Sequence, residues 1–596
     1  MATRSALASV RAYLAQYRAS IAWGIIFLAL SNLFGRSVLW VLKAGIDSLS
    51  HPASSLLFYA GLIVGLTALQ GSLRFCGRWT LIGMARDVEF ALRNRLYAHL
   101  QSLSPSFYSR TPTGDLMSRL TQDLTVVRQL FGAGIMYTAG TGLTYITTVP
   151  VMVAIDPELT LLALLPYPFL LVTLLRSQRI VHERFEEVQE SFTRLTEKAQ
   201  ENLSGIRLVK SYVMEEREAE EFAGINEVYV GRNLRLAKVE GLFNVLSSVL
   251  SGIGVVIVLW LGGRRVIEGS VSLGGFVAFN GYLITLIWPT AALAWIISVI
   301  QRGLVSLERV NAILSETPTI RDADRPSPIQ SLRGEIEFRN LSLTYAGRQQ
   351  PALKDVSLNI PAGSRVAIVG PTGAGKSSLV QCLPRLLEIP EGRLFFDGVD
   401  TTRIPLLTLR QSIGYVPQES FLFSATLREN IAFGRPDAPL EEVRAAAITA
   451  GLEREIAELP RGLETVVGER GITLSGGQRQ RVTLARALMM SPAILVLDDS
   501  LSSVDAETEA AILERLSPVM IGRTTLIITH RLTTIQSADL IVVMEEGQIV
   551  EKGRHDELLS SHGLYAELWH RQQLLSELES LTLPPHALLR KAKQGG

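Results

Sequence analysis

Cysteine and net charge are the two features that this 596-residue chain has least of. Its two cysteines, Cys76 and Cys382, fit neither a disulfide framework nor a metal-ligand spacing, and we expect both to be buried free thiols. The formal net charge is +1, so no global field recruits nucleic acid, and basic residues matter only by their location. These shortages argue against a disulfide-stapled domain, a cysteine metal centre and a nucleic-acid partner.

A cleavable signal peptide is also not recognisable at the amino terminus. The first apolar run begins only after Arg18, continues for a full membrane thickness and ends without a small-residue cleavage site. Hydrophobic residues make up 47% of the chain, yet the C-terminal part reads as an ordinary soluble domain, so the excess apolarity lies in the N-terminal half. The length alone predicts two or more domains.

Six stretches of the N-terminal half reach or approach the roughly 20 mainly apolar residues that a bilayer span requires. Arg36 in the first and two prolines in the fourth weaken those two individually, but six such stretches are hard to explain as soluble core helices. We therefore expect residues 1–314 to form an all-α polytopic membrane domain with six transmembrane helices. The predicted spans are Ile21–Val41, Leu56–Leu73, Gly134–Ile155, Leu159–Leu175, Phe243–Leu261 and Leu273–Ile300.

The connections between these spans are unequal, and their lengths predict the topology. Those after the second and fourth spans are long, helical in pattern and rich in arginine. The positive-inside rule places both, with the amino terminus, in the cytoplasm, although Arg264 and Arg265 fall on the opposite side. Each long connection has one turn signal, at Thr111–Asp115 and at Asn202–Gly205. We expect helical hairpins that continue the membrane helices, since structureless loops of this length are uncommon.

A linker at 315–333, containing several prolines, separates this region from a segment of different texture. Between 334 and 574, short β-type runs alternate with helical stretches, as in a mainly parallel sheet with crossover helices. The polar tail at 575–596 is assigned no role. The predicted strands are Ile336–Phe338, Val366–Val369, Ile494–Asp498, Thr525–Thr529 and Leu540–Met544.

A complete phosphate-binding loop, GPTGAGKS, follows the strand that ends at Val369 and opens a helix at about Ser378. Its glycines let backbone N–H groups surround phosphate oxygens, Lys376 meets the β- and γ-phosphates, and the Ser377 hydroxyl ligates Mg²⁺. The strand ending at Asp498 supplies a carboxylate suited to holding Mg²⁺ through its water shell. The predicted nucleotide-binding residues here are Gly370, Thr372, Gly373, Ala374, Gly375, Lys376, Ser377 and Ser378.

A second anion site is predicted by the motif LSGGQ, which precedes the helical run Arg479–Met489. Ser475 and the bare amides of Gly476 and Gly477 then stand with Gln478 at a helix N-terminus. With this motif the chain resembles the ABC transporter ATPases. Its whole plan resembles the exporter half-transporters, in which a six-helix membrane domain precedes one α/β P-loop ATPase domain, called a cassette.

The resemblance implies ATP and Mg²⁺ as cofactors, and it implies that the signature motif of one cassette closes over ATP held by the phosphate loop of another. The chain has one of each and no internal repeat, so two ATP sites need two chains. Further roles follow from the resemblance alone. They are adenine stacking by Tyr345, linkage of Mg²⁺ to the membrane-domain contact by Gln418, an exporter-specific loop at Thr465–Gly471, a dimer-interface loop at Ser502–Asp505, and a switch histidine at His530.

The chain departs from the family pattern at Asp499, where the residue that polarises the attacking water is usually Glu. Asp is one methylene shorter, which withdraws the carboxylate by about one C–C bond length of ~1.5 Å. Misplacement by about 1 Å can lower a rate on the order of 10²-fold. Asp499 is therefore either a slower ordinary catalytic residue or part of a degenerate site. The degenerate site would predict a heterodimer, as in heterodimeric bacterial multidrug exporters, because the signature is intact.

The resemblance implies ATP-driven export of drugs, lipids or peptides across the inner (plasma) membrane, with the ATPase domain and both termini cytoplasmic. The partner is a second half-transporter, and the surroundings are membrane lipids. The cytoplasmic loop contacts are expected near Thr113–Leu116 and Arg207–Tyr212. The alternatives are a homodimeric lipid flippase with two equivalent slow sites, a soluble ABC ATPase of DNA repair or chromosome structure, and an ATP-gated channel.

Four residues of the predicted spans could line a substrate cavity. Arg36, Asn280, Trp288 and Trp295 would suit amphipathic or anionic molecules. In the alternative interpretation, Arg36 extends to the membrane surface and the tryptophans belong to an interfacial belt.

Overall fold

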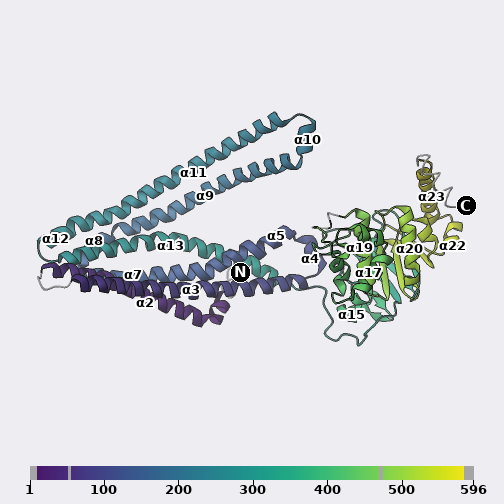
Figure 1. Ribbon diagram of the computed structural model, residues 1–596, viewed down its shortest axis with the longest axis horizontal. Coiled ribbons are helices and arrows are strands. Elements are labelled where there is room, and N and C mark those ends of the chain that lie inside the picture. Colours follow the sequence, from purple (N-terminus) through teal and green to yellow (C-terminus); the bar gives the residue numbers. More distant parts are fainter. Residues whose placement is uncertain are drawn as a thin grey trace. The chain divides into compact units, whose positions relative to one another are not determined.

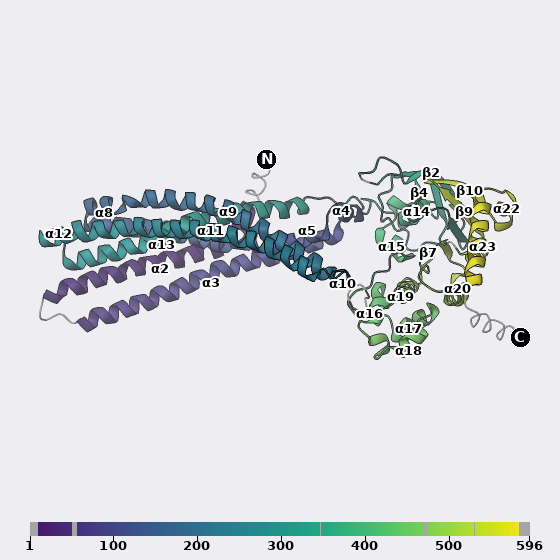
Figure 2. The same cartoon turned by 90° about the horizontal axis from the view of Figure 1, so that it is seen from above.

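The computed structural model of the chain describes residues 10–50, 56–345, 347–468, 471, 474–529 and 531–582 (Figures 1 and 2). The chain separates into two compact units. The helical unit ends at Glu316. The α/β unit begins at Thr317 and also includes Leu103–Thr111, a short segment from within the helical half of the sequence.

Six helical stretches of the helical unit are long and apolar enough to cross a membrane, judged by length and composition among the described residues. Each contains one of the six predicted spans, so that prediction is confirmed. The stretches are Arg18–Asp47, Leu56–Ser102, Thr113–Ile155, Pro157–Ser204, Glu215–Ile267 and Leu273–Leu314. Their individual helices are α2 (Arg18–Asp47), α3 (Leu56–Ser102), α5 (Thr113–Ser118), α6 (Leu124–Gln129), α7 (Ile135–Ile155), α8 (Pro157–Leu164), α9 (Pro166–Ser204), α10 (Ile206–Ser211), α11 (Glu215–Ile257), α12 (Gly263–Ile267) and α13 (Leu273–Leu314), with the 3-10 turn η1 (Ser48–Ser50) and the π-helical turns η2 (Arg119–Asp123), η3 (Leu130–Gly134) and η4 (Val258–Gly262).

The long connections are continuous with the membrane helices, as the sequence predicts. Helix α3 has 47 residues, or about 70 Å at 1.5 Å per residue, more than twice the hydrocarbon thickness of about 30 Å. Helices α9 and α11 run antiparallel and are joined through α10 (Figure 1). Lys198 of α9 forms ion pairs with Glu218 and Glu221 of α11, at 2.7 and 2.8 Å, which hold this hairpin together.

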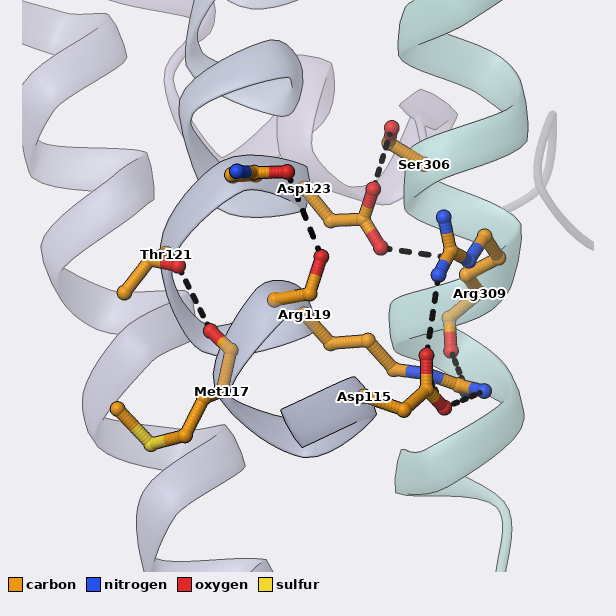
Figure 3. A network of polar contacts seen from close by, with 9 residues as sticks. Asp115, Met117, Arg119, Thr121, Asp123, Ser306 and Arg309 are labelled. Carbon is orange, nitrogen blue, oxygen red and sulfur yellow. Dashed lines mark hydrogen bonds and ion pairs between the residues drawn. The ribbon is translucent and has the colours of Figure 1, made fainter. Parts of the chain in front are cut away.

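A polar network fastens the last turns of α13 to the start of the third membrane helix (Figure 3). Asp115 accepts hydrogen bonds from Arg119 (2.7 Å) and from Arg309 of α13 (3.2 Å). Asp123, which is buried, accepts from Ser306 (2.9 Å) and lies 3.4 Å from Arg309. Because α13 leads directly to the end of the helical unit, this network fixes the point at which the chain leaves that unit.

One cysteine prediction is wrong. Cys382 is a buried free thiol, as expected, and burial raises its pKa to about 12. Cys76 is free but exposed on α3, on the same side as the exposed Phe75 and Trp79. An exposed apolar face on a helix of spanning length suits lipid or a partner chain, so apolarity there does not indicate burial within the protein.

The α/β unit is built on a six-stranded sheet of order β10-β9-β3-β8-β7-β6, parallel except for β10. The predicted parallel sheet is therefore confirmed. All five residues of β7 are buried, as expected of a central strand written as a continuous apolar run. The strands are β3 (Arg365–Val369), β6 (Ile413–Val416), β7 (Ile494–Asp498), β8 (Thr524–Ile528), β9 (Leu540–Glu545) and β10 (Gln548–Gly553).

A second sheet, antiparallel and of order β2-β1-β4-β5, packs its buried side into the same core. Strand β1 of this sheet contains Ile336–Phe338, which the sequence analysis placed among the strands of the parallel sheet. That placement is wrong, because the sequence of one short strand does not show which strand it pairs with. The strands are β1 (Ile336–Leu343), β2 (Leu353–Ile360), β4 (Leu394–Phe396) and β5 (Val399–Asp400). The helices of this unit are α4 (Pro105–Arg110), α14 (Lys376–Cys382), α15 (Leu406–Gln411), α16 (Leu427–Ile431), α17 (Leu440–Thr449), α18 (Glu453–Glu458), α19 (Gly476–Met489), α20 (Ala506–Met520), α21 (Leu532–Gln536), α22 (His555–Ser560) and α23 (Leu564–Thr582), with the 3-10 turns η5 (Thr401–Arg403), η6 (Ala432–Gly434) and η7 (Gly462–Glu464).

Candidate nucleotide-binding site

The phosphate loop lies between β3 and α14, at the carboxyl end of a central parallel strand. Gly370 has a φ of 146°, and a Cβ there would collide with the carbonyl oxygen of Met544. Gly375 has a φ of 95°, and a Cβ would lie 2.6 Å from the carbonyl oxygen of Ala352. Only glycine fits at both positions, which leaves the backbone N–H groups of the loop uncovered for an anion.

Lys376 is buried inside the curve of this loop. Its Nζ donates to the carbonyl oxygens of Gly370 and Pro371, both at 2.8 Å. Burial lowers the pKa of this lysine, and the nearby carboxylates of Asp499 and Asp498 oppose that shift. The ammonium is thus held in the concavity where the loop would place a phosphate.

The residues assigned to Mg²⁺ lie together. Ser377 Oγ donates to Asp498 Oδ1 at 2.9 Å, and Gln418 lines the same cavity. Asp498 is buried, which raises its pKa, while hydrogen bonds from Ser377 and Tyr415 act in the opposite direction. A hydroxyl, a carboxylate and an amide oxygen fit the oxygen preference of Mg²⁺, which usually completes its shell with water and phosphate. When bound, the ion would neutralise phosphate charge.

Tyr415 is a site residue that the sequence analysis missed. Its hydroxyl donates to the second oxygen of Asp498 at 3.2 Å. The residue comes from β6, which pairs in parallel with β7 and places Tyr415 opposite Val496. No motif marks this position, and only the strand pairing brings it to the site.

A cavity of about 1280 Å³ adjoins the phosphate loop, and most of the residues predicted to bind nucleotide or Mg²⁺ at this loop line it. Tyr345 lines it and exchanges a hydrogen bond with the Ser378 hydroxyl at 2.9 Å, next to the expected adenine position. The predicted residues that line the cavity are Tyr345, Thr372, Gly373, Ala374, Gly375, Lys376, Ser377, Ser378, Gln418, Asp498 and Asp499.

Helix α4 also lines this cavity, through Ser106, Ser109 and Arg110 among others. The loop contacts expected near Thr113–Leu116 and Arg207–Tyr212 stay predictions; Thr113–Leu116 belongs to α5 in the helical unit. The boundary lies at Pro112, which forces the preceding residue out of the helical conformation and so separates α4 from α5.

Asp499 lies at the edge of the cavity with a φ of 47°, a left-handed conformation that only a minority of non-glycine residues adopt. Its backbone N–H donates to the carbonyl oxygen of Ile528 on β8 at 3.1 Å, which fixes the turn after β7. The carboxylate therefore starts from a constrained backbone.

The signature residues form a separate face of the same unit. Ser475 caps α19, accepting from the Gln478 N–H at 3.2 Å, and the Gln478 side chain accepts from the Ser475 N–H at 2.9 Å. This reciprocal pair is a capping box, so the sequence fixes where α19 begins. Ser475, Gly476, Gly477 and Gln478 are all described residues, and none of them lines the cavity at the phosphate loop.

The predicted interface loop Ser502–Asp505 is held by Gln480 and by Arg531. Gln480 of α19 donates to the Ser502 hydroxyl (3.1 Å) and accepts from the Ser503 N–H (3.0 Å). Arg531 donates to the Val504 carbonyl at 2.9 Å. His530 lies outside the described residues, as do Glu469 and Arg470 of the predicted exporter loop, so those assignments stay predictions.

Comparisons with known proteins match both units. The family model described as ABC transporter transmembrane region matches residues 19–290, and that described as ABC transporter matches residues 353–502. The "Probable multidrug resistance ABC transporter ATP-binding/permease protein YheI" of Bacillus subtilis (strain 168) is 40% identical over 90% of this chain and 91% of that protein.

Two further relatives are of similar extent. The multidrug resistance-like ATP-binding protein MdlA of Escherichia coli (strain K12) is 34% identical over 93% of this chain and 94% of its own length. An ATP-dependent lipid A-core flippase of Syntrophus aciditrophicus (strain SB) is 34% identical over 92% of this chain and 91% of its own length. Among solved structures, a bacterial Atm1-family ABC exporter with ATP bound superimposes with a TM-score of 0.78 at 29% identity, covering 93% of this chain and 99% of that one.

Proposed function

The chain belongs to the ABC transporters, as an exporter half with a fused membrane region and ATPase, and on this premise we propose that it is one subunit of a heterodimer. ATP-driven export is the activity of this family. The proposed cargo is hydrophobic or amphipathic, either drugs, lipids or peptides. The names of the relatives, which include multidrug resistance proteins and lipid A-core flippases, favour this range.

The observation that carries the heterodimer proposal is the pairing of Asp499 with an intact signature. Asp499 replaces the usual Glu on a constrained backbone, while Ser475–Gln478 forms a complete capped helix start. In a homodimer both ATP sites would contain the shortened carboxylate. In a heterodimer, the signature of this chain completes a competent site on a partner that supplies Glu. Within the class of heterodimeric bacterial multidrug exporters, the pattern is similar to that of the TmrB subunit of the TmrAB pair.

We place Mg²⁺ at Ser377, Asp498 and Gln418, and both the α/β unit and the two termini on the cytoplasmic side of the plasma membrane. The arginine-rich connections support this orientation through the positive-inside rule. ATP binding would close the two cassettes, and hydrolysis would reset them. Helix α4, which lines the nucleotide cavity, is the segment of the helical half that we assign to sensing the nucleotide.

A homodimeric lipid flippase with two equivalent slow sites is the second candidate. Two observations favour it: Asp499 lines the nucleotide cavity, and several relatives are named lipid A-core flippases. The two candidates make opposite predictions about subunit composition.

Native mass spectrometry of the transporter purified from its own cells tests the choice. We expect this chain to co-purify with a different half-transporter that carries Glu after its Mg²⁺-binding Asp. An active complex containing only copies of this chain would overturn the heterodimer proposal and favour the flippase alternative.

A further inference from the structure

A polar cavity of about 380 Å³ lies within the helical unit, among α2, α3, α7 and α13. These four helices pack against one another in the helical unit, and all four are labelled in Figure 1. Helices α2 and α3 approach closely at Gly35, where a Cβ would lie 2.7 Å from Gln70 Nε2. The cavity is therefore part of the built interior of this unit.

Three arginines line this cavity, which we call the arginine cavity: Arg36 of α2 and Arg74 and Arg78 of α3. Its lining includes no Asp or Glu among the described residues. On α3, Gln70, Arg74 and Arg78 follow at intervals of four, so they share one face of the helix. Of the three, only Arg36 is buried, and a buried positive charge without an acidic neighbour in the lining is costly unless an anion is present.

Arg36 is the most informative of the three, because it is 9% exposed and its Nε has no hydrogen-bond partner. Within the described part of the chain, the only side-chain hydrogen bond of Arg36 is a long one, 3.4 Å from Nη2 to Asn32 Oδ1. That amide oxygen also accepts from Thr144 at 2.9 Å. The buried Thr141 hydroxyl, also in the lining, has no partner either. Two buried polar groups thus face the cavity with unused hydrogen-bonding capacity.

The position along α3 suits a lipid-like headgroup. At 1.5 Å per residue, Arg74 and Arg78 stand about 27 and 33 Å from the α3 start at Leu56, close to one full hydrocarbon thickness. They therefore mark the far membrane boundary, while the buried Arg36 lies deeper in the span. An anion entering at that boundary would meet the two exposed arginines first.

An aromatic group adjoins the charged end. Trp288 lines the cavity, and its ring centroid lies 5.5 Å from that of Tyr137. Tyr137 also contacts Trp295 edge-on at 5.2 Å. Aromatic side chains bind apolar chains and rings, so the cavity offers one charged end and one apolar end.

We propose that the arginine cavity binds the phosphate headgroup of an anionic amphiphile, with Tyr137 and Trp288 contacting its apolar part. Arginine forms paired hydrogen bonds with phosphate oxygens, which explains three arginines better than a preference for cationic drugs. Arg36 determines specificity, since its guanidinium holds unused donors at the buried end. This inference rests on the proposed export function and names its substrate class.

Binding to the purified full-length transporter in lipid nanodiscs tests the proposal. The probes are radiolabelled dodecyl phosphate, dodecyltrimethylammonium with the same chain and opposite charge, and inorganic phosphate as competitor. We expect dodecyl phosphate to bind at least tenfold more tightly than the ammonium probe. Arg36→Gln and the exposed Arg74→Gln should each weaken it by about tenfold, the size expected for one charge-assisted hydrogen bond. Arg86→Gln, on α3 but outside the cavity, is the matched control and should bind as the parent does.

Equal binding of the two amphiphiles, or unchanged binding in both Arg36→Gln and Arg74→Gln, would overturn the proposal. Competition by inorganic phosphate at the affinity of dodecyl phosphate would show a free-phosphate site and overturn the amphiphile assignment. ATP-driven uptake into sealed vesicles is measured on the same preparation. Active uptake without a headgroup preference refutes only the arginine cavity, whereas absent uptake of every probe, with ATP hydrolysis intact, refutes the export function.

Discussion

The α/β unit presents two anion-binding faces that differ in completeness. The phosphate-loop face has a buried lysine, a Ser377–Asp498 pair and a roomy cavity, but its carboxylate at Asp499 is one methylene short. The signature face has every expected residue, with Ser475 and Gln478 locked in a capping box. In the proposed heterodimer, the first face binds nucleotide with little hydrolysis, and the second completes the ATP site of the partner.

The difference is explained by the proposed heterodimer, in which the two faces serve different ATP molecules. Gln480 of the signature helix α19 and Arg531 both hydrogen-bond to the interface loop Ser502–Asp505. The proposed division of labour assigns nucleotide retention to the first face and catalytic support to the second. Four predictions test it, in decreasing order of expected effect.

Lys376→Ala should have the largest effect, and it acts on the phosphate-loop face. Removing the buried ammonium removes the cation nearest the phosphates, and a charge-assisted contact of about 1.5–3 kcal/mol corresponds to a 10- to 100-fold loss of ATP affinity. Equilibrium binding of ATP at this chain's own site, in the full complex, measures it. Lys552→Ala, exposed on β10, is the control. Unchanged affinity in Lys376→Ala would remove the assignment of the loop.

Ser475→Arg acts on the signature face and should lower steady-state ATP turnover of the complex at least tenfold, since it blocks the site completed on the partner. Arginine also removes the helix cap, so a second variant is needed. Ser475→Asp retains a capping acceptor but places a negative charge against phosphate, and it should be comparably severe. Ser560→Arg on α22 is the matched control. Normal turnover in Ser475→Asp would contradict the role given to this face.

Asp499→Asn should change total ATP turnover by less than about twofold, because a site with a displaced carboxylate already contributes little. The corresponding Glu→Gln change in the partner should nearly abolish turnover and trap ATP. Single-turnover ATPase measurements on both variants decide the order of effects. If Asp499→Asn is as damaging as the partner change, the two sites are equivalent and the comparison of faces loses its basis.

Much of this arrangement could be predicted from sequence because its signals are local. Six apolar runs, the phosphate loop and the LSGGQ motif each specify a structure over a few residues, and each lies where expected. The prolines that weakened the fourth span coincide with a real break, between α8 and α9. The sites of Tyr345 and Gln418 were predicted from the family resemblance instead, since no local motif marks these two residues.

What could not be predicted depends on contacts between distant segments. Tyr415 reaches Asp498 only because β6 pairs with β7, and α4 lines the nucleotide cavity although it is over 200 residues away in sequence. Asn280 and Trp295 were predicted to line a substrate cavity, but neither is in the lining of the arginine cavity, which Trp288 and Arg36 do join. Arg74 and Arg78 were missed because the predicted span ended at Leu73.

The smallest expected effect concerns Glu509, whose carboxylate pairs with Arg531 Nε at 2.9 Å; Arg531 in turn donates to the Val504 carbonyl of the interface loop. Burial raises the pKa of Glu509 from 4.5 to about 7, although Arg531 acts in the opposite direction. The folded protein therefore keeps a proton between pH 4.5 and 7 that the unfolded chain has lost. The stability that this group contributes is fully present below pH 4.5 and is lost as the pH rises through about 7.

Glu509→Gln cannot titrate, so its melting temperature relative to the parent should rise by a few degrees between pH 5 and pH 8. Thermal unfolding of the purified complex across this range measures the difference, with Glu514→Gln, exposed on the same helix, as control. A difference that stays constant with pH would show that Glu509 is ionised throughout and that the loop is held by a permanent ion pair.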